Sequence, residues 1–305
     1  MNPSTETPIS HNFPVFFWGV IGKSFGIFRR FFLNYLILAL VSYLPFLILD
    51  IFSSIDTVDL IEFFHGNFLD VLIFLTLPTV YMQSRVLPLA TIQLFFQRFF
   101  ASVVLISFVQ LGILIFFTQF FAQISLGAIL IGILPYIYLI FAGFFLIMEN
   151  SPKLVSVRHN LLNSIKLTRT RFFVIFWNYI MITLLTVIPL FMFSAWYLTG
   201  RPEMGAFTDV FNQNPENSVL MGEKLLELIE VFKQPGFKWS RIIIHVLFRP
   251  IKSLFLCFLF LGIMFQLSPD RVKSFLGIGE TDQKPSVIEE DPPENREESQ
   301  QNDIH

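Results

Sequence analysis

The chain has 305 residues, of which 54% are hydrophobic, 17% aromatic and only 14% charged. Soluble domains carry about 25% charged residues, and most of their surface must tolerate water. The composition, with a mean hydropathy of +0.64, therefore excludes a water-soluble globule. It predicts an all-α fold, a polytopic membrane helix bundle.

The N-terminal region is predicted to begin with a disordered segment, residues 1–12, followed by a membrane domain over residues 13–276. Within residues 13–30, apolar side chains recur at helical spacing on one face: Phe17, Val20, Ile21, Phe25, Phe28 and Phe32. The other face carries Gly19, Lys23, Gly26 and Arg30. This spacing predicts an amphipathic helix that lies flat in the membrane interface and then turns into the first span.

Six apolar stretches are each near the ~20 residues that cross the hydrocarbon core of a bilayer. They cover residues 31–52, 68–84, 101–124, 127–148, 172–199 and about 247–267. The last stretch reaches full length only if Arg249 and Lys252 lie in its first turns, from which long side chains can extend to the interface. We therefore expect about six transmembrane helices.

The distribution of Lys and Arg predicts the orientation of these spans, because cytoplasmic loops keep an excess of both residues. An alternating path with the N-terminus inside places fourteen of them on the cytoplasmic side. Five lie outside, four of them in a long outer loop, residues 200–240, and the fifth, Arg241, directly after it. Both termini are therefore predicted to be cytoplasmic.

Two further segments are predicted to be interfacial helices. Residues 153–171 place Leu154, Leu161, Ile165 and Phe172 on an apolar side, with His159, Asn163, Lys166 and Thr170 opposite. In the outer loop, a short helix is expected around residues 220–232, closed by Gln234, Pro235 and Gly236. The C-terminal tail, residues 277–305, is strongly acidic and proline-bearing, which predicts a disordered cytoplasmic extension.

Catalytic motifs are absent from the sequence. The five histidines are scattered, the chain has one cysteine, and there is no HExxH pair, nucleophile turn or phosphate-binding loop. We therefore expect no enzyme, no catalytic residue, no metal site and no cofactor. Nucleic acid is not an expected partner either, whereas membrane lipids are.

The densest polar feature is a basic stripe, at offsets of three or four residues that fall on one helix face. It consists of Lys238, Arg241, His245, Arg249 and Lys252. At the outer end of a span, such a stripe can bind a lipid phosphate or an anionic solute. The alternative is that these side chains extend to the interface and pack against acids of the same outer loop.

Amide side chains mark the third span. Gln119 and Gln123 share a face, which favours helix-to-helix hydrogen bonds. Prolines fall within or beside several apolar runs, and broken helices can form transport sites. A transporter or exporter of a small or lipid-like anionic solute, using this Gln119 and Gln123 face, is therefore the alternative function.

Residues 130–176 resemble the glycerophosphodiester phosphodiesterase membrane-domain family and its stand-alone relatives among bacterial inner-membrane proteins. In that pattern a proline-bearing span ends in an acid, and a short helix with a Ser and an LT pair precedes the next span. Here these places are filled by Pro135, Glu149, Ser164, Leu167 and Thr168. The segment GKSFGIFRRFFLNYL, residues 22–36, is similar to the family's amphipathic entry helix.

The resemblance implies a six-helix membrane module in the cytoplasmic (inner) membrane, without a reaction of its own. In the phosphodiesterase relatives, hydrolysis belongs to a separate barrel of about 250 residues, for which this chain has no room. Glu149 is expected to play a structural role at the cytoplasmic interface. It would either accept hydrogen bonds at the N-terminus of the 153–171 helix or pair with Arg85 or Lys166.

Together these features predict a non-enzymatic, multi-pass membrane protein that engages phospholipid headgroups. A scaffold that binds other membrane proteins through the acidic tail is a further possibility.

Overall fold

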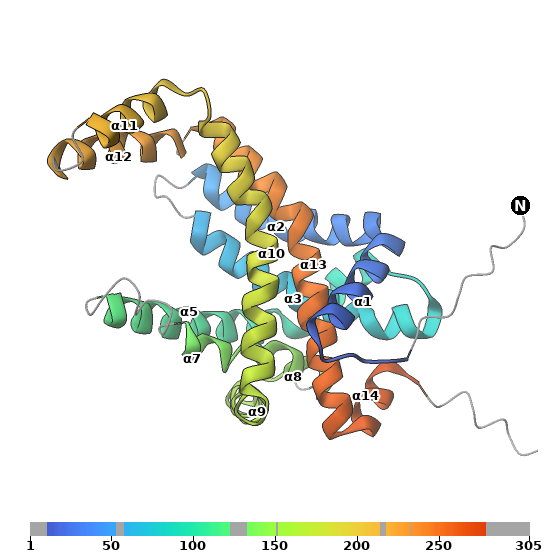
Figure 1. Cartoon of the computed structure of the whole chain (residues 1–305). Helices are drawn as coiled ribbons and strands as arrows, with labels where there is room; N and C mark the ends of the chain where they lie inside the picture. The colour runs from blue at the N-terminus through green and yellow to red at the C-terminus, as the bar shows by residue number, and fades with distance from the viewer. Residues whose placement is uncertain are drawn as a thin grey trace, which may run out of the picture.

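The computed structural model describes residues 11–52, 58–122, 133–150, 152–213, 218–232 and 234–278 (Figure 1). All regular secondary structure in these ranges is helical, in agreement with the all-α prediction. The helices are α1 (Phe17–Arg30), α2 (Phe32–Phe52), α3 (Val58–Gln83), α4 (Pro88–Leu94), the π-helix η1 (Phe95–Phe99), α5 (Phe100–Ala122), α7 (Leu134–Ile137), α8 (Ala142–Met148), α9 (Ser156–Thr170), α10 (Phe172–Leu198), α11 (Pro202–Gln213), α12 (Ser218–Phe232), α13 (Pro235–Leu267) and α14 (Pro269–Leu276). Residues 1–10 and 279–305, which include most of the predicted disordered termini, lie outside the described residues.

Four of the described helical segments are long and apolar enough to cross a membrane: Ile61–Gln83, Pro88–Phe120, Phe172–Leu198 and Trp239–Leu267. A fifth span is formed if α1 and α2, which meet at a bend of 90°, are counted as one. The predicted span 127–148 is described only from residue 133, where α7 and α8 form a shorter apolar segment. These helices indicate a membrane-embedded protein.

The centre of the bundle is formed by α3 and α13, which are buried along most of their length. Aromatic side chains fill the surrounding space, as where Phe74 of α3 stacks on Phe144 of α8 with ring centroids 4.8 Å apart. By contrast, α10 runs along one side of the bundle (Figure 1) and exposes large apolar side chains. Phe191 and Trp196 are 71% and 70% exposed, as expected for a face whose solvent is lipid.

Contacts between helices give their relative directions. Tyr35 and Ser42 of α2 bond Thr76 and His65 of α3, so these two helices are antiparallel. The α3–α5 pair is also antiparallel, because Phe64 contacts Phe108 and Phe68 contacts Phe100. Further contacts make α5 antiparallel to the α7–α8 segment and α10 antiparallel to α13. The α3–α13 pair is parallel, since its contacts advance together along both helices.

The fourth apolar segment is broken between α7 and α8, where the backbone makes bonds from residue i+3 to residue i instead of a regular α-helix. Ser164 of α9 forms hydrogen bonds with backbone groups at this break. Its hydroxyl donates to the Tyr138 carbonyl at 2.8 Å and accepts from the Phe141 amide at 3.2 Å. The buried face of α9 is consequently polar, since it contains Asn160, Ser164 and Thr168.

The apolar side predicted for the 153–171 helix is not the side that packs inside the protein. Leu154 is 55% exposed and Ile165 37% exposed, whereas Asn160, Ser164 and Thr168 are buried. The reason is that α9 packs on α8 and supplies hydrogen bonds to the broken segment beside it. Helical periodicity shows which residues share a face of a helix. Which face of α9 packs inside the protein depends on the backbone of the neighbouring α7–α8 segment. The placement of this helix in the membrane interface stays a prediction.

The entry helix also packs differently from its prediction. Its buried residues are Val20, Ile21, Ser24, Ile27 and Phe28. This face packs against α13, whereas Phe25 remains 46% exposed. The Lys23 ammonium lies 4.2 Å from the centre of the Phe13 ring. The helix is therefore part of the bundle, and the predicted turn into α2 is present as the bend of 90°.

The outer loop contains two helices rather than the single one that was predicted. The expected helix is α12, and α11 precedes it; the two pack together at one end of the molecule, beyond α10 and α13 (Figure 1). The helix α12 ends at Phe232, just before Gln234, Pro235 and Gly236, which were predicted to close it, and Pro235 also occupies the first turn of α13. A proline suits this position because its missing amide hydrogen is not needed there.

Candidate functional site

The seam between α3 and α13 carries a ladder of ionisable residues. Along α13, Arg241, His245 and Arg249 recur every four residues and so share one face. On α3, Glu62 and Asp70 are eight residues apart and share a face in the same way. Because the two helices run parallel, both sets meet in register. Arg241 Nε lies 2.9 Å from Glu62 Oε1, and one Arg249 terminal nitrogen lies 2.9 Å from Asp70 Oδ2.

Asp70 is held by two partners from α13. Besides Arg249, the Ser253 hydroxyl donates to Asp70 Oδ1 at 2.5 Å. Gly66 provides space for the guanidinium, because a Cβ at this position would lie 2.5 Å from a terminal nitrogen of Arg249. A charged side chain is costly inside a membrane. The pairing of Asp70 with Arg249 explains how both are accommodated there.

Two histidines extend the ladder toward α2. His65 of α3 is fully buried, and its Nδ1 lies 3.1 Å from Nε2 of His245. His65 Nε2 lies 3.1 Å from the Ala39 carbonyl oxygen and 3.0 Å from the Ser42 hydroxyl. On the other side, His245 Nδ1 lies 3.8 Å from Glu62 Oε2. The result is a continuous polar path from α2 through both imidazoles to Glu62.

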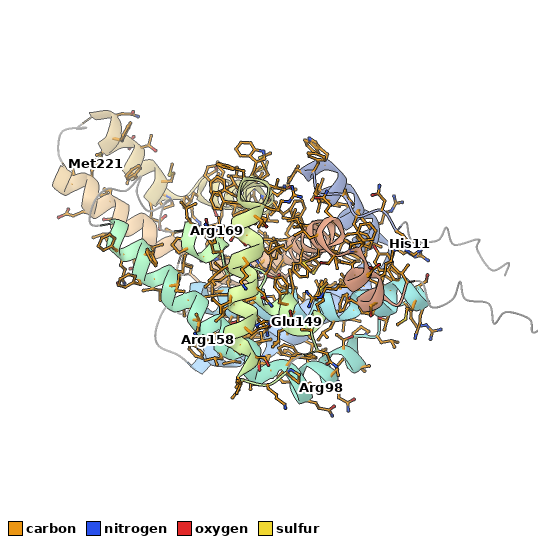
Figure 2. The ribbon with its side chains drawn as sticks, turned by 90° about the horizontal axis from the view of Figure 1, so that it is seen from below. His11, Arg98, Glu149, Arg158, Arg169 and Met221 are labelled. Atoms are coloured by element: carbon orange, nitrogen blue, oxygen red, sulfur yellow. The ribbon has the colours of Figure 1, made fainter. Side chains whose placement is uncertain are left out.

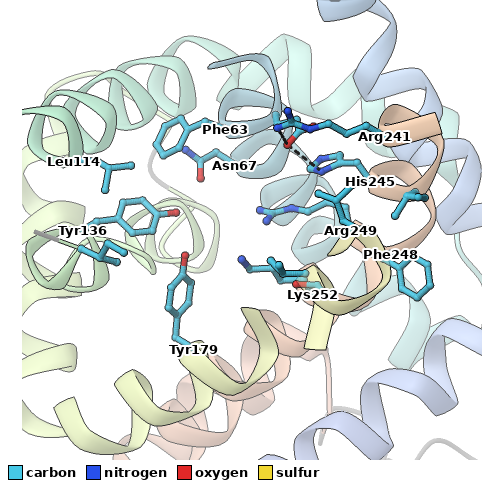
Figure 3. Close-up of a pocket in the computed structure, with 16 residues that line it drawn as sticks. Phe63, Asn67, Leu114, Tyr136, Tyr179, Arg241, His245, Phe248, Arg249 and Lys252 are labelled. Atoms are coloured by element: carbon cyan, nitrogen blue, oxygen red, sulfur yellow. Dashed lines mark hydrogen bonds and ion pairs between the residues drawn. The ribbon is translucent and has the colours of Figure 1, made fainter. Parts of the chain in front are cut away.

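A cavity of about 360 Å³ adjoins this ladder (Figure 3). Arg241, His245, Arg249 and Lys252 line one side of it, and the hydroxyl groups of Tyr136 and Tyr179 point toward its interior from the opposite side. Asn67 adds an amide. Apolar residues complete the wall, among them Leu114 of α5 and Val187 and Leu190 of α10.

The charges around the cavity do not balance. Arg241 and Arg249 each face a carboxylate, those of Glu62 and Asp70. Lys252 instead has its ammonium 4.9 Å from the centre of the Tyr179 ring, and no carboxylate within 4 Å among the described residues. The Nε of Arg249 is buried and has no hydrogen-bond partner among the described residues. With neutral histidines, three cations thus face two anions, which favours an anionic ligand.

The structure places three residues of the basic stripe against α3, which the sequence did not predict. Arg241, His245 and Arg249 contact Glu62, His65 and Asp70 of that helix. The side chain of Lys238 lies outside the described residues. Sequence reasoning missed the α3 residues and both tyrosines. A usable signal existed for the acids, since Glu62 and Asp70 repeat at helical spacing beside an apolar run.

The other singled-out polar residues lie elsewhere. Gln119 is exposed, and Gln123 lies outside the described residues. The amide that joins helices is Gln110, which accepts from Asn67 at 3.0 Å and donates to the Leu139 carbonyl at 2.8 Å. Of the predicted transport face, Gln119 is therefore not among the residues that line this cavity.

Glu149 lies at the opposite end of the bundle, beside α9, as seen in Figure 2. It accepts a hydrogen bond from Asn163 at 3.0 Å and lies 3.6 Å from both His159 and Arg271. The predicted partners were the α9 N-terminus, Arg85 or Lys166; Asn163 and His159 belong to α9, and Arg271 was not predicted. Glu149 joins α9 to α14, because Arg271 belongs to the latter helix.

Within the described ranges, no group of three or more His, Cys, Asp or Glu residues is arranged to hold a metal ion. Comparison with known proteins adds no relative: no family model matches the chain, and neither a curated protein nor a solved structure is significantly similar.

Proposed function

We propose that this protein binds an anionic amphiphile, such as a phospholipid, with its charged headgroup in the cavity between α3, α10 and α13. The observation that carries the proposal is the excess of cations over carboxylates around that cavity, with Lys252 as the cation that lacks a carboxylate among the described residues. A phosphate group suits a site of this kind, because Arg and Lys donors and tyrosine hydroxyls all hydrogen-bond to its oxygens.

The apolar part of the wall favours a lipid over a small hydrophilic anion. Leu114, Val187 and Leu190 line the cavity on the side of α5 and α10, and Val187 is itself 49% exposed. Since α10 presents mostly apolar side chains to its surroundings, an acyl chain can leave the cavity along this side without meeting water.

Substitution of Lys252 by Met tests the site directly. We expect Lys252→Met to weaken binding of dioctanoyl phosphatidylglycerol by about tenfold, the effect of losing one charge-assisted contact worth ~1.5 kcal/mol. The measurement is native mass spectrometry or calorimetric titration of the full chain in a mild detergent. Because Lys252 has no carboxylate within 4 Å among the described residues, whereas Asp70 is paired with Arg249, the variant breaks no direct ion pair.

A matched control is Lys273→Met, which removes the same charge from an exposed position on α14. It should bind the lipid as the wild-type protein does. Equal affinities for wild type and Lys252→Met, or equal binding of the zwitterionic dioctanoyl phosphatidylcholine, would show that the cavity is not the headgroup site.

A transporter of the same anionic ligand is the second candidate. The observation that favours it is the broken segment between α7 and α8, because Ile133 and Tyr136 of this segment line the cavity. Broken helices recur at transport sites. Flux of phosphatidylglycerol or a small phosphate ester across proteoliposomes, lost in Lys252→Met, would support transport. Binding without flux would restrict the function to binding.

We propose six spans, formed by α2, α3, α5, the α7–α8 segment, α10 and α13. The helix directions support this count: α13 runs parallel to α3, which requires an odd number of crossings between them. The helices α5 and α10 supply only two, and the α7–α8 segment supplies the third. The same path, with the Lys and Arg distribution, leads to cytoplasmic termini and an inner-membrane location.

This topology predicts opposite accessibility for the two ends of the molecule. In intact cells, a membrane-impermeant thiol reagent should label Lys224→Cys of α12 but not Lys273→Cys of α14. Cys257 is buried and therefore gives little background. Labelling of both positions from outside would refute the six-span topology.

We further propose that the protein has no enzymatic activity. We also propose that it is related to the family that residues 130–176 resemble, and that residues 277–305 bind a partner.

A further inference from the structure

The paired histidines have a hydrogen-bond arrangement that can be assigned from their neighbours. The Ala39 carbonyl oxygen only accepts, and the Ser42 hydroxyl donates its own hydrogen to that carbonyl at 3.0 Å. Both oxygens therefore act as acceptors toward Nε2 of His65, at 3.1 Å and 3.0 Å, so this nitrogen carries the hydrogen. In a neutral His65, Nδ1 is then an acceptor. The hydrogen between the two rings, whose nitrogens are 3.1 Å apart, therefore belongs to Nε2 of His245.

This assignment determines what His245 presents to Glu62. A neutral His245 with its hydrogen on Nε2 has a lone pair on Nδ1, 3.8 Å from Glu62 Oε2. Two acceptors then face each other. A second proton, on Nδ1, converts this contact into an ion pair between an imidazolium and a carboxylate. The geometry therefore provides one defined position for one additional proton.

The surrounding positive charges oppose that proton. Arg241, Arg249 and Lys252 lie on the same helix as His245 and line the same cavity. Asp70 is engaged by Arg249, and Arg241 shares Glu62 with His245. Among the described residues of α2, α3 and α10, the other titratable groups around His245 are His65, Tyr43, whose ring centre is 6.5 Å from that of His245, and Tyr179. Tyr136 of α7 also lines the cavity.

We infer that binding of an anion in this cavity is coupled to uptake of one proton at Nδ1 of His245. An anion beside Arg249 and Lys252 offsets the positive charge that opposes the imidazolium, so that ligand and proton stabilise each other. The inference rests on the proposed binding function and adds to it a proton-coupled ligand. By linkage, the ligand must then bind more tightly as the pH falls.

Calorimetric titration of the full chain with dioctanoyl phosphatidylglycerol tests the coupling. Its phosphodiester lacks the second proton of a phosphate monoester, so any proton taken up belongs to the protein. Titrations in two buffers of different ionisation enthalpy give the number of protons. For wild type we expect uptake of up to one proton, and lipid binding that weakens by up to tenfold for each unit rise in pH over the range in which that proton is taken up.

The variant His245→Gln should bind the lipid without proton uptake and without this pH dependence, because an amide can still donate to His65 but does not titrate. His159→Gln, at an exposed position on α9, is the matched control and should behave as wild type. Circular dichroism and gel filtration verify that each variant is folded.

The three ways in which the experiment can fail are distinguishable. Lipid binding by wild type with the same enthalpy in both buffers and no pH dependence would overturn the coupling and leave the binding function intact. Proton uptake that persists in His245→Gln would overturn the assignment to His245. Absence of lipid binding by folded wild-type protein at every pH would overturn the binding function and the coupling with it.

Discussion

We expect Arg249→Ala to destabilise the protein by about 3–5 kcal/mol, because it leaves the Asp70 carboxylate buried without the guanidinium that pairs with it. The two side chains are 14% and 10% exposed and 2.9 Å apart, so the ion pair is largely withdrawn from solvent. The measurement is the unfolding midpoint in a denaturing-detergent titration. Arg271→Ala, which removes an arginine whose side chain is 56% exposed, should shift the midpoint by much less.

A double variant separates the ion pair from general packing. Asp70→Asn combined with Arg249→Met removes both charges, while the amide introduced on α3 keeps an oxygen that can accept from Ser253. Replacement of a buried pair by neutral groups of similar size is often close to neutral. The double variant should therefore recover most of the stability lost in Arg249→Ala. No recovery would show that the two charges do not act as a pair.

Ser164→Val is expected to cost about 2–4 kcal/mol of unfolding free energy. Valine adds one branch relative to serine, and it leaves the Tyr138 carbonyl without its 2.8 Å donor and the Phe141 amide without its 3.2 Å acceptor. Each buried polar group that loses its partner costs about 1–3 kcal/mol. Denaturing-detergent titration, with the near-ultraviolet signal of the aromatic side chains, reports the loss.

Ser164→Thr is the control for this variant, since it keeps the hydroxyl and adds the same branch as valine. It should retain most of the stability. If Ser164→Val and Ser164→Thr unfold at the same midpoint, the hydroxyl does not stabilise the break between α7 and α8, and that segment obtains its order from packing alone.

Uniformly apolar segments were the part of the fold that the sequence could predict. The expected spans 31–52, 101–124 and 172–199 agree closely with α2, α5 and α10. By contrast, α3 begins at Val58 and α13 at Pro235, about ten residues before the predicted spans. Glu62 and Asp70 on α3 and Arg241 on α13 lower the local hydropathy there. The cost of placing these charges in a membrane is offset by partners about 180 residues away in the sequence. A hydropathy average over neighbouring residues does not include those partners.

Part of the candidate site could also be predicted from the sequence, and part could not. Offsets of three and four residues on α13 are sufficient to place Arg241, His245, Arg249 and Lys252 along one face. What lies opposite depends on which helix packs there and in which direction it runs. The pairing of His65 with His245 and the approach of Tyr136 and Tyr179 follow from that packing, so periodicity in one segment could not reveal them.

The wide sequence separation within the α3–α13 ladder has a consequence for biogenesis. At a synthesis rate of about 5–20 residues per second, α3 is complete roughly 10–40 s before Arg249 exists to meet Asp70. During this interval the translocon must accept a helix whose Glu62, His65 and Asp70 lack their final partners. Each such charge near the bilayer centre costs ~2.5–3.5 kcal/mol on insertion. A nascent chain that stops before α13 therefore contains a poorly anchored α3, which makes truncated products good substrates for membrane quality-control proteases.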